Sequence, residues 1–501
     1  MHIEDEAPLR MASHDTLGPV ETSAPKLERT LTLSGAVRLN LLDMIGVGPF
    51  ITLPLLLGAM GGPQAMLGWI LGALLAVCDG LVWAELGAAM PEAGGTYHYL
   101  GKKFHGRLGR LLSFLFLFQL CLTAPLSVAS GCIGLSQYAT YLVPRLAVPP
   151  VTHTLRVAGY SAAFSVGPTT FVAIAVVLLA VLLLYRNLAK VRVLSIVLLS
   201  VVLGTIAWAV VVGLMHGHIA QVFAFPPHAF VLNRAFFAGL GSAMLIATYD
   251  YWGYYNVTFL GGETRDPGRT IPRAVLLSIA LVALLYLMLN ASVLSVIGTP
   301  QLLAAQNLEA RRALLSQFMQ VAYAPSLGAH AATLLGKLAA LLVMVTAFAS
   351  VFSLLLGYSR IPYAAARDGN FLPAFGKLHS TRKFPHVSLL VLGLIACICC
   401  FFSLSDVIAA LVVLRILLQF GLQHIGVMVL RMRQPEMPRP FRLWLYPLPP
   451  LLALAGFGYI VVSRPNFHRE VLLAVVVAIV GCVAFAARGV GYKRGNNPGT
   501  P

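Results

Sequence analysis

Long apolar windows, separated by short polar connections, fill this chain from residue 33 to residue 488. A helix needs ~20 mostly apolar residues to cross a bilayer, and about twelve windows suit such a crossing. They run approximately over residues 33–58, 63–90, 106–142, 169–185, 193–215, 234–262, 273–298, 331–366, 386–403, 406–430, 443–463 and 470–487. The pattern predicts an all-α, multi-pass membrane protein with one transmembrane domain over residues 33–488.

The connections and the two ends of the chain are polar. The windows at 106–142 and 331–366 are longer than one crossing needs, so these helices are expected to tilt or to extend into water. Residues 301–325 form a polar connection with room for a short helix outside the bilayer. Residues 1–32 lack the apolar core of a signal peptide, and residues 489–501 are basic and contain several glycines and a proline. Both ends are predicted to be disordered cytoplasmic tails.

Composition and charge narrow the class of protein further. With 58% hydrophobic and 11% charged residues, the chain is too apolar for a soluble domain. The net charge of +17 would suit a nucleic-acid partner, but the basic residues lie in short connections, where they orient the protein and face anionic lipid. Nucleic-acid binding is therefore excluded as the function. Basic residues favour one side of the predicted bilayer, among them Lys102, Arg265, Arg367, Lys377 and Arg431. This bias predicts an even number of spans and a cell (inner) membrane protein with both termini in the cytoplasm.

Two apolar windows carry helix-breaking sequences at mid-depth. The first holds Gly46-Val47-Gly48-Pro49-Phe50, and the second holds the Gly- and aromatic-rich segment from Tyr249 to Tyr254. Unpaired backbone is tolerated within a bilayer only where it is buried in protein or lines a cavity. Two broken helices in corresponding positions are typical of secondary transporters, in which half-helix ends bind the substrate.

Four blocks in order resemble one family. They lie at 45–50, in the first break; at 83–97, with the sequence Trp-Ala-Glu-Leu-Gly-Ala-Ala-Met-Pro-Glu-Ala-Gly-Gly-Thr-Tyr; at 262–273; and at 359–369. Together they resemble the amino acid–polyamine–organocation (APC) permeases over residues 30–490. The resemblance implies the leucine-transporter-type fold, with two inverted five-helix repeats and two extra helices. It also implies amino acid transport by alternating access.

The resemblance places the substrate site on the two breaks. Backbone N–H groups around Gly46, Val47 and Gly48 would hold a carboxylate, which the positive end of a half-helix favours. Carbonyl groups freed in the second break would hold the amine, and Tyr249 occupies the position of a gating aromatic. The predicted substrate-binding residues are Ile45, Gly46, Val47, Gly48, Phe50, Tyr249, Asp250, Tyr251, Trp252 and Gly253.

The chain also departs from the family pattern. Val47 and Pro49 replace the serine and isoleucine of the common Gly-Ser-Gly-Ile-Phe motif, and Asp43 stands where an asparagine often precedes it. Some proton-coupled relatives carry a lysine midway along helix 5, but the window at 193–215 has none. That coupling device is therefore absent from this chain.

Acidic and basic residues inside the windows are further candidates, since intramembrane charge is costly and usually functional. Asp250 is interpreted as a counter-ion for a substrate ammonium group or as a proton carrier; the alternative is a cap for backbone N–H groups. Asp43, Glu85 and Arg415 are candidates for gating or coupling. Glu85 belongs to a family block and suits a structural or inner-gate role. Arg415 is too deep to reach water, so Asp79 or Asp43 is expected to pair with it.

The favoured interpretation is a sodium-independent amino acid permease, driven by protons or by exchange. A polyamine or organic-cation permease of the same fold is the first alternative. A membrane enzyme would need a polar catalytic cluster, and a channel would need a repeated filter; neither pattern is found. No phosphate-binding loop indicates an ATP-driven pump, and no cofactor is expected. The cluster of Cys397, Cys399 and Cys400 has no flanking His or acid, so no metal site is predicted.

Overall fold

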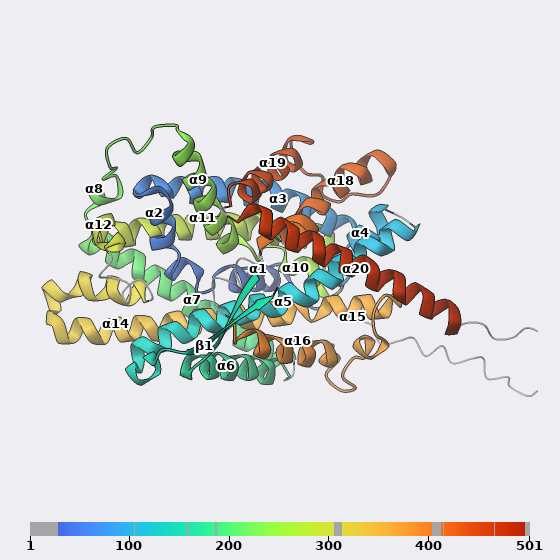
Figure 1. Ribbon diagram of the computed structural model, residues 1–501, viewed down its shortest axis with the longest axis horizontal. Coiled ribbons are helices and arrows are strands. Elements are labelled where there is room, and N and C mark those ends of the chain that lie inside the picture. Colours follow the sequence, from blue (N-terminus) through green and yellow to red (C-terminus); the bar gives the residue numbers. More distant parts are fainter. Residues whose placement is uncertain are drawn as a thin grey trace, which may run out of the picture.

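The computed structural model describes residues 29–104, 106–157, 160–185, 188–304, 313–402, 412–413, 415–464 and 466–495. Figure 1 shows a bundle of long helices that lie roughly along the longest axis of the molecule. Most of the predicted N-terminal tail, residues 1–28, and the last residues of the predicted C-terminal tail, 496–501, lie outside the described residues. The final helix continues past Arg488 and ends at Gly495.

The first apolar window forms a broken helix, as its sequence predicts. Helix α1 covers Leu33–Met44, the 3₁₀ turn η1 covers Gly48–Phe50, and α2 covers Leu53–Met60. Thr32 caps α1, since its hydroxyl accepts a hydrogen bond from the N–H of Gly35 at 3.4 Å. The helix stops because Pro49 has no N–H to donate, and the glycines before it favour non-helical backbone.

The second predicted break is also present. Helix α9 covers Arg234–Tyr251, and the short α10 covers Asn256–Phe259. Between them Gly253 has φ = 124°, a conformation that side-chain-bearing residues rarely adopt. A Cβ at Gly253 would lie 2.8 Å from the backbone nitrogen of Met44, so glycine is also needed for the close approach to α1. The two breaks therefore lie against each other.

The other predicted windows contain helices of the bundle wherever the structure describes them; the first part of the window at 406–430 lies outside the described residues. The longer ones are α3 (Met66–Ala89), α4 (Thr96–Phe104), α5 (Gly106–Leu142), α6 (Pro168–Leu184), α7 (Leu188–His216), α11 (Pro267–Val296), α14 (Leu314–Tyr358), α15 (Arg360–Arg367), α16 (His386–Cys399), α18 (Leu422–Arg433), α19 (Leu448–Val462) and α20 (Phe467–Gly495). The short ones are η2 (Pro63–Ala65), η3 (Pro144–Ala147), α8 (Ile219–Val222), η4 (Gly261–Glu263), α12 (Thr299–Leu303), η6 (Pro373–Gly376) and the π-helical turn η7 (Ile416–Gly421). In the described part of the chain, six helical segments are long and apolar enough to cross a membrane, and α6, α16 and α19 are shorter apolar helices.

Three local features differ from the expectations. Helix α14 starts at Leu314, inside the expected polar connection, and is interrupted at Gly328, where φ is 80°. The long window at 331–366 is divided, because α15 begins as a separate helix at Arg360. The chain also contains one antiparallel hairpin of β1 (Val151–Val157) and β2 (Tyr160–Val166), with Val151 opposite Val166. It lies in the connection between α5 and α6, so the transmembrane helices themselves are unaffected.

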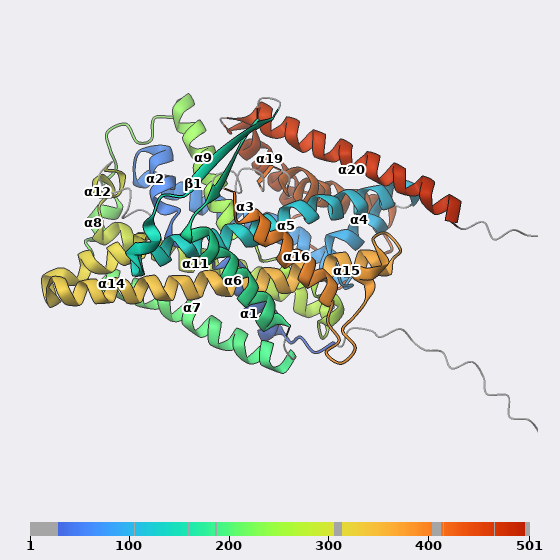
Figure 2. The same cartoon turned by 60° about the horizontal axis from the view of Figure 1, so that its bottom comes forward.

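The two ends of the bundle differ in the charge of their elements. Helices α4 and α15 lie at one end, and α8 and α12 lie at the other, as Figures 1 and 2 both show. Lys102 belongs to α4, while Arg360 and Arg367 belong to α15. These residues belong to the set predicted to share one side of the membrane, and the side that this end of the bundle faces stays a prediction.

Candidate functional site

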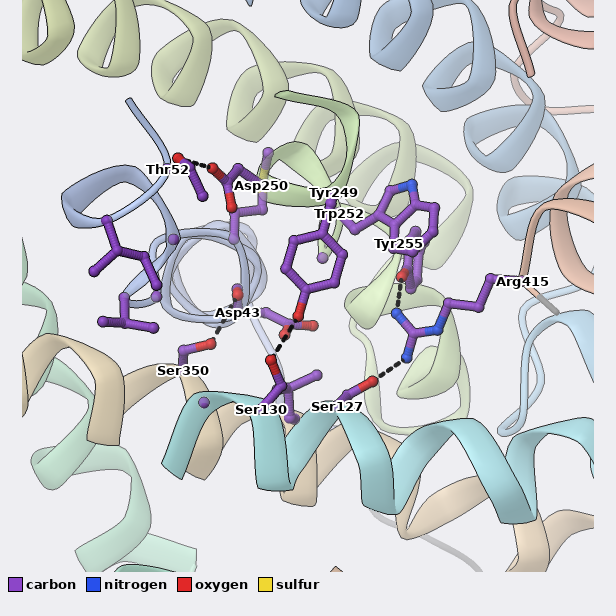
Figure 3. A pocket seen from close by; sticks show the side chains of 18 of the residues that line it. Asp43, Thr52, Ser127, Ser130, Tyr249, Asp250, Trp252, Tyr255, Ser350 and Arg415 are labelled. Atoms are coloured by element: carbon purple, nitrogen blue, oxygen red, sulfur yellow. Dashed lines mark hydrogen bonds between the residues drawn. The ribbon is translucent and has the colours of Figure 1, made fainter. Parts of the chain in front are cut away.

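A cavity lies where the two helix breaks meet, and α5, α14 and Arg415 complete its wall (Figure 3). Its lining combines free backbone, hydroxyl groups, two carboxylates and one guanidinium. The lining residues are Asp43, Met44, Gly46, Val47, Gly48, Ile51, Thr52, Ser127, Ser130, Gly131, Tyr249, Asp250, Trp252, Gly253, Tyr255, Ser350, Leu354, Tyr358 and Arg415.

The first break offers hydrogen-bond donors to this cavity. The N–H of Gly46 donates to the carbonyl of Met44 at 3.1 Å, and the N–H of Phe50 donates to the carbonyl of Val47 at 3.0 Å. The N–H groups of Val47 and Gly48, between them, have no acceptor among the described residues. They sit where the second half of the helix begins, so the partial positive charge of a helix N-terminus adds to their donor capacity.

Asp250 lies directly against the first break. Its Oδ2 accepts a hydrogen bond from the hydroxyl of Thr52 at 2.6 Å, and only 4% of the residue is exposed. A Cβ at Gly48 would lie 2.0 Å from Oδ1 of Asp250, so the carboxylate fills the space that glycine leaves free. Among the described residues no backbone N–H donates to this carboxylate, which is not the geometry that the capping interpretation expects.

The hydrogen-bond partners of Arg415 are neutral, which corrects the expected pairing with Asp79; Asp43 lines the same cavity and interacts with Arg415 electrostatically without a direct ion pair. Its guanidinium donates to the hydroxyls of Ser127 at 2.5 Å, Tyr358 at 2.6 Å and Tyr255 at 3.3 Å. Two of these bonds are drawn in Figure 3. No carboxylate lies within 4.0 Å of it in the part of the chain described. The sequence suggested a carboxylate because a buried charge needs compensation, but hydroxyl groups and aromatic faces supply part of it here.

Unpaired polar atoms remain beside the cavity. Nε of Arg415 and Oδ2 of Asp43 are buried without a hydrogen-bond partner among the described residues. Both residues line the cavity. The guanidinium of Arg415 thus contributes an unpaired donor, and the carboxyl group of Asp43 contributes an unpaired acceptor. Buried polar atoms of this kind call for an explanation.

Tyr249 crosses the cavity between the second break and α5. Its hydroxyl lies 3.0 Å from Oγ of Ser130, as Figure 3 shows, and its ring lies 5.8 Å from that of Trp252. The side chain thus links the second break to α5. A gating role for Tyr249 stays a prediction.

The cavity does not include every residue that the sequence suggested. Ile45, Phe50 and Tyr251 are packed in the hydrophobic core, and the Tyr251 hydroxyl donates to the carbonyl of Trp69 at 3.3 Å. Conversely, Ser127 and Ser130 were missed, although two serines three positions apart on one face of an apolar helix are a usable signal. Thr52, Ser350 and Tyr358 gave no comparable signal.

Glu85 lies away from the cavity and anchors α3 to α18. Its Oε1 accepts a hydrogen bond from Nε of Arg431 at 2.9 Å and lies 3.4 Å from Nε of Arg439. Its Oε2 accepts from the N–H of Leu443 at 2.9 Å and also contacts Arg431. The residue is 1% exposed, so two guanidinium groups compensate one buried carboxylate.

Glu85→Ala is expected to destabilise the protein by roughly 3–5 kcal/mol, because it leaves buried guanidinium charge unpaired. The measurement is the apparent melting temperature of the detergent-purified variant. Glu92→Ala is the matched control, since Glu92 pairs with Lys102 at 2.5 Å on a surface where both side chains are 48% exposed. Such a pair is worth about 0–1 kcal/mol. Equal melting temperatures for the two variants would remove the anchoring role from Glu85.

Known proteins resemble this chain over most of its length. It is 25% identical over 436 residues to a branched-chain amino acid permease of Bacillus subtilis, covering 86% of this chain and 88% of that protein. It is 23% identical over 445 residues to a serine/threonine exchanger of the same bacterium, covering 87% and 91%. It is 26% identical over 464 residues to the Asc-type amino acid transporter 1 of Mus musculus, covering 91% and 79%.

A family profile described as amino acid permease matches residues 31–486, which confirms the resemblance inferred from the four sequence blocks. The matched range includes both helix breaks and Arg415. The chain therefore belongs to the amino acid permease family, among the amino acid–polyamine–organocation permeases.

Proposed function

We propose that this protein is a secondary-active amino acid permease that works by alternating access, with the cavity at the two helix breaks as its substrate site. The observation that carries the proposal is the meeting of both breaks at one cavity, with unpaired N–H groups on Val47 and Gly48. Backbone donors of this kind suit a carboxylate. The proposed fold is the leucine-transporter type, with about twelve spans in two inverted repeats and two extra helices.

The charge pattern of the cavity suits an α-amino acid. An α-amino acid carries its ammonium and carboxylate groups on one carbon, so it needs an acceptor next to a donor. Asp250 lies against Gly48, and Asp43 lines the same cavity from the end of α1. In the proposed complex the N–H groups of Val47 and Gly48 hold the carboxylate, and Asp250 faces the ammonium group.

The contacts around the cavity are compatible with alternating access. Opening toward one side requires the hydroxyl contact between Tyr249 and Ser130 to separate, and this single hydrogen bond has a small net free energy of ~0.5–1.5 kcal/mol. Substrate that bridges the two breaks favours the closed arrangement, because it contacts both half-helices. Transport is proposed to be coupled to protons or to exchange of a second substrate molecule.

A thermal-shift screen of purified protein tests the proposed substrate class. The panel contains L-leucine, L-serine, L-threonine, L-alanine, L-glutamate, L-cystine and putrescine, and a ligand of the folded state raises the apparent melting temperature. At least one amino acid is expected to shift wild type and to leave Gly48→Leu unchanged. A shift by putrescine alone would replace the amino acid assignment with the polyamine alternative.

Topology is tested by labelling. Residues 101–110 and 377–385 are expected to face the cytoplasm, because their basic side chains belong to the cytoplasmic set. Single cysteines placed there in a variant without the native cysteines should resist a membrane-impermeant thiol reagent in intact cells and react after lysis. A cysteine at His228, in the connection between α8 and α9, is the control and should react in intact cells. Labelling of 377–385 from outside would reverse the orientation.

A further inference from the structure

A buried pair of an aspartate and a histidine lies outside the cavity and does not belong to the proposed substrate site. Nε2 of His424, on α18, lies 3.1 Å from Oδ1 of Asp79, on α3, and neither side chain is exposed. The hydroxyl of Tyr254, in the second break, donates a hydrogen bond to Oδ2 of the same aspartate. The three residues thus join two helices of the bundle to the broken helix.

The hydrogen bonds of His424 determine how many protons the pair holds. Nδ1 lies 2.7 Å from the carbonyl oxygen of Phe420, and a carbonyl only accepts, so Nδ1 carries a hydrogen. In a neutral imidazole with that tautomer, Nε2 presents a lone pair. A lone pair facing a carboxylate oxygen at 3.1 Å is repulsive, and neither atom has another hydrogen-bond partner among the described residues. The contact is stable only if one proton is shared between the two groups.

We infer that the Asp79–His424 pair is a proton-binding site that couples protonation to movement of the second helix break. With the proton bound, the pair draws α18 and α3 together and holds Tyr254. When the proton leaves to water, the imidazole lone pair and the carboxylate repel each other. The carboxylate of Asp79 then no longer holds the position in which it accepts the hydrogen bond from Tyr254. No bond other than the N–H or O–H bond of the proton is made or broken.

The second break connects this pair to the cavity. Tyr254 lies between Gly253 and Tyr255, and both of these neighbours line the cavity. Asn40 of α1 holds the same segment, since it donates to the carbonyl of Tyr254 at 2.7 Å and accepts from the N–H of Val257 at 3.0 Å. A change at Asp79 therefore reaches both broken helices through one residue and its neighbours.

Two other titratable side chains lie close to the pair in the described part of the chain. Cys78 precedes Asp79 on α3, and the ring of Tyr255 lies 5.3 Å from that of Tyr254. Where α3 meets α11, Ile279 contacts Gly80, and α19 places Phe457 5.9 Å from the ring of His424. Ile279 and Phe457 are apolar and exclude water from the pair. Release of the proton therefore depends on a rearrangement of the helices.

The first test needs no transported substrate. Tryptophan fluorescence of the purified protein is followed across pH, because Trp252 lies in the break and Trp83 stacks on Tyr255 at 4.8 Å. Wild type should show a pH-dependent transition that Asp79→Asn and His424→Gln abolish. His386→Gln is the control, since His386 has no ion-pair partner among the described residues, and it should keep the transition. The same transition in both pair variants, or none in wild type, would overturn the inference.

The second test measures coupling and rests on the proposed transport function. Proteoliposomes are loaded so that the pH gradient drives protons inward, and uptake of radiolabelled L-leucine, L-serine and L-glutamate is compared with uptake without the gradient. The gradient should stimulate wild type severalfold and should leave His424→Gln within about twofold of its gradient-free rate. Exchange at equal pH should persist in the variant, which shows that it is folded. A variant that keeps the stimulation contradicts the proton site, whereas wild type that transports none of the three amino acids contradicts the proposed substrate class alone.

Discussion

Gly48→Leu is expected to abolish uptake of any transported amino acid while the protein still reaches the membrane. Even the first carbon of the new side chain would lie 2.0 Å from Oδ1 of Asp250, so the carboxylate must leave its bond with Thr52. The rest of the leucine would occupy the space next to the unpaired N–H groups of Val47 and Gly48. Radiolabelled uptake in cells, normalised to membrane expression, measures the effect.

Two further variants show whether a loss of uptake is specific to the first break. Gly204→Leu, on α7, is the matched control, because a Cβ there meets no atom within 4 Å, and its uptake should stay near that of wild type. Gly46→Leu should also lose uptake, since a Cβ at Gly46 would already lie 3.1 Å from Oγ of Ser350. Normal uptake by both Gly46→Leu and Gly48→Leu would move the substrate site away from the first break.

Asp250→Asn is expected to weaken apparent substrate affinity by ~1.5–3 kcal/mol, the range for hydrogen bonds to charged groups. That corresponds to a roughly 10- to 150-fold rise in the apparent dissociation constant. The reason is that an amide oxygen remains available to the hydroxyl of Thr52, but the negative charge that faces the substrate ammonium is lost. Uptake by proteoliposomes across a range of amino acid concentrations measures the change, and cationic amines should be affected more than neutral amino acids.

The control and the pH profile separate the roles considered for Asp250. Thr52→Val removes the hydroxyl partner but keeps the carboxylate, so it should change affinity much less than Asp250→Asn. If Asp250 carries the coupling proton instead, Asp250→Asn should flatten the pH dependence of uptake and spare counter-exchange. Unchanged affinity, selectivity and pH profile would leave Asp250 with a structural role, and the substrate site would rest on the backbone of the first break.

The acidic residues have different proposed roles in substrate binding and in proton binding. Asp250 and Asp43 line the cavity, whereas Asp79 is enclosed with His424 behind the second break. A substrate counter-ion must stay charged to hold an ammonium group, while a proton site must change its protonation during the cycle. The two groups lie apart, and Tyr254 connects them, since it donates a hydrogen bond to Asp79 and stands between two residues that line the cavity.

The features that depend on local chemistry could be read from the amino-acid sequence alone. The breaks at Gly46–Pro49 and near Gly253 follow from the absence of a Cβ or of an N–H, and no tertiary contact is needed to recognise them. The extent of α5, Gly106–Leu142, equals that of its apolar window, because helix length and hydrophobicity are also local properties.

Which side chains contact one another depends instead on how the helices pack. Arg415 was expected to pair with an acid, but its hydroxyl partners come from α5, α14 and the second break, and their distances along the chain gave no hint of this contact. Asp79 pairs with His424 instead, and no periodic sequence pattern predicts a contact between residues so far apart along the chain. Tyr251 and Phe50 lie within the predicted motifs yet face the core, because the rotation of each half-helix is set by its packing against its neighbours. A sequence records where a helix must break, whereas the partners of a buried charge depend on how all the helices pack together.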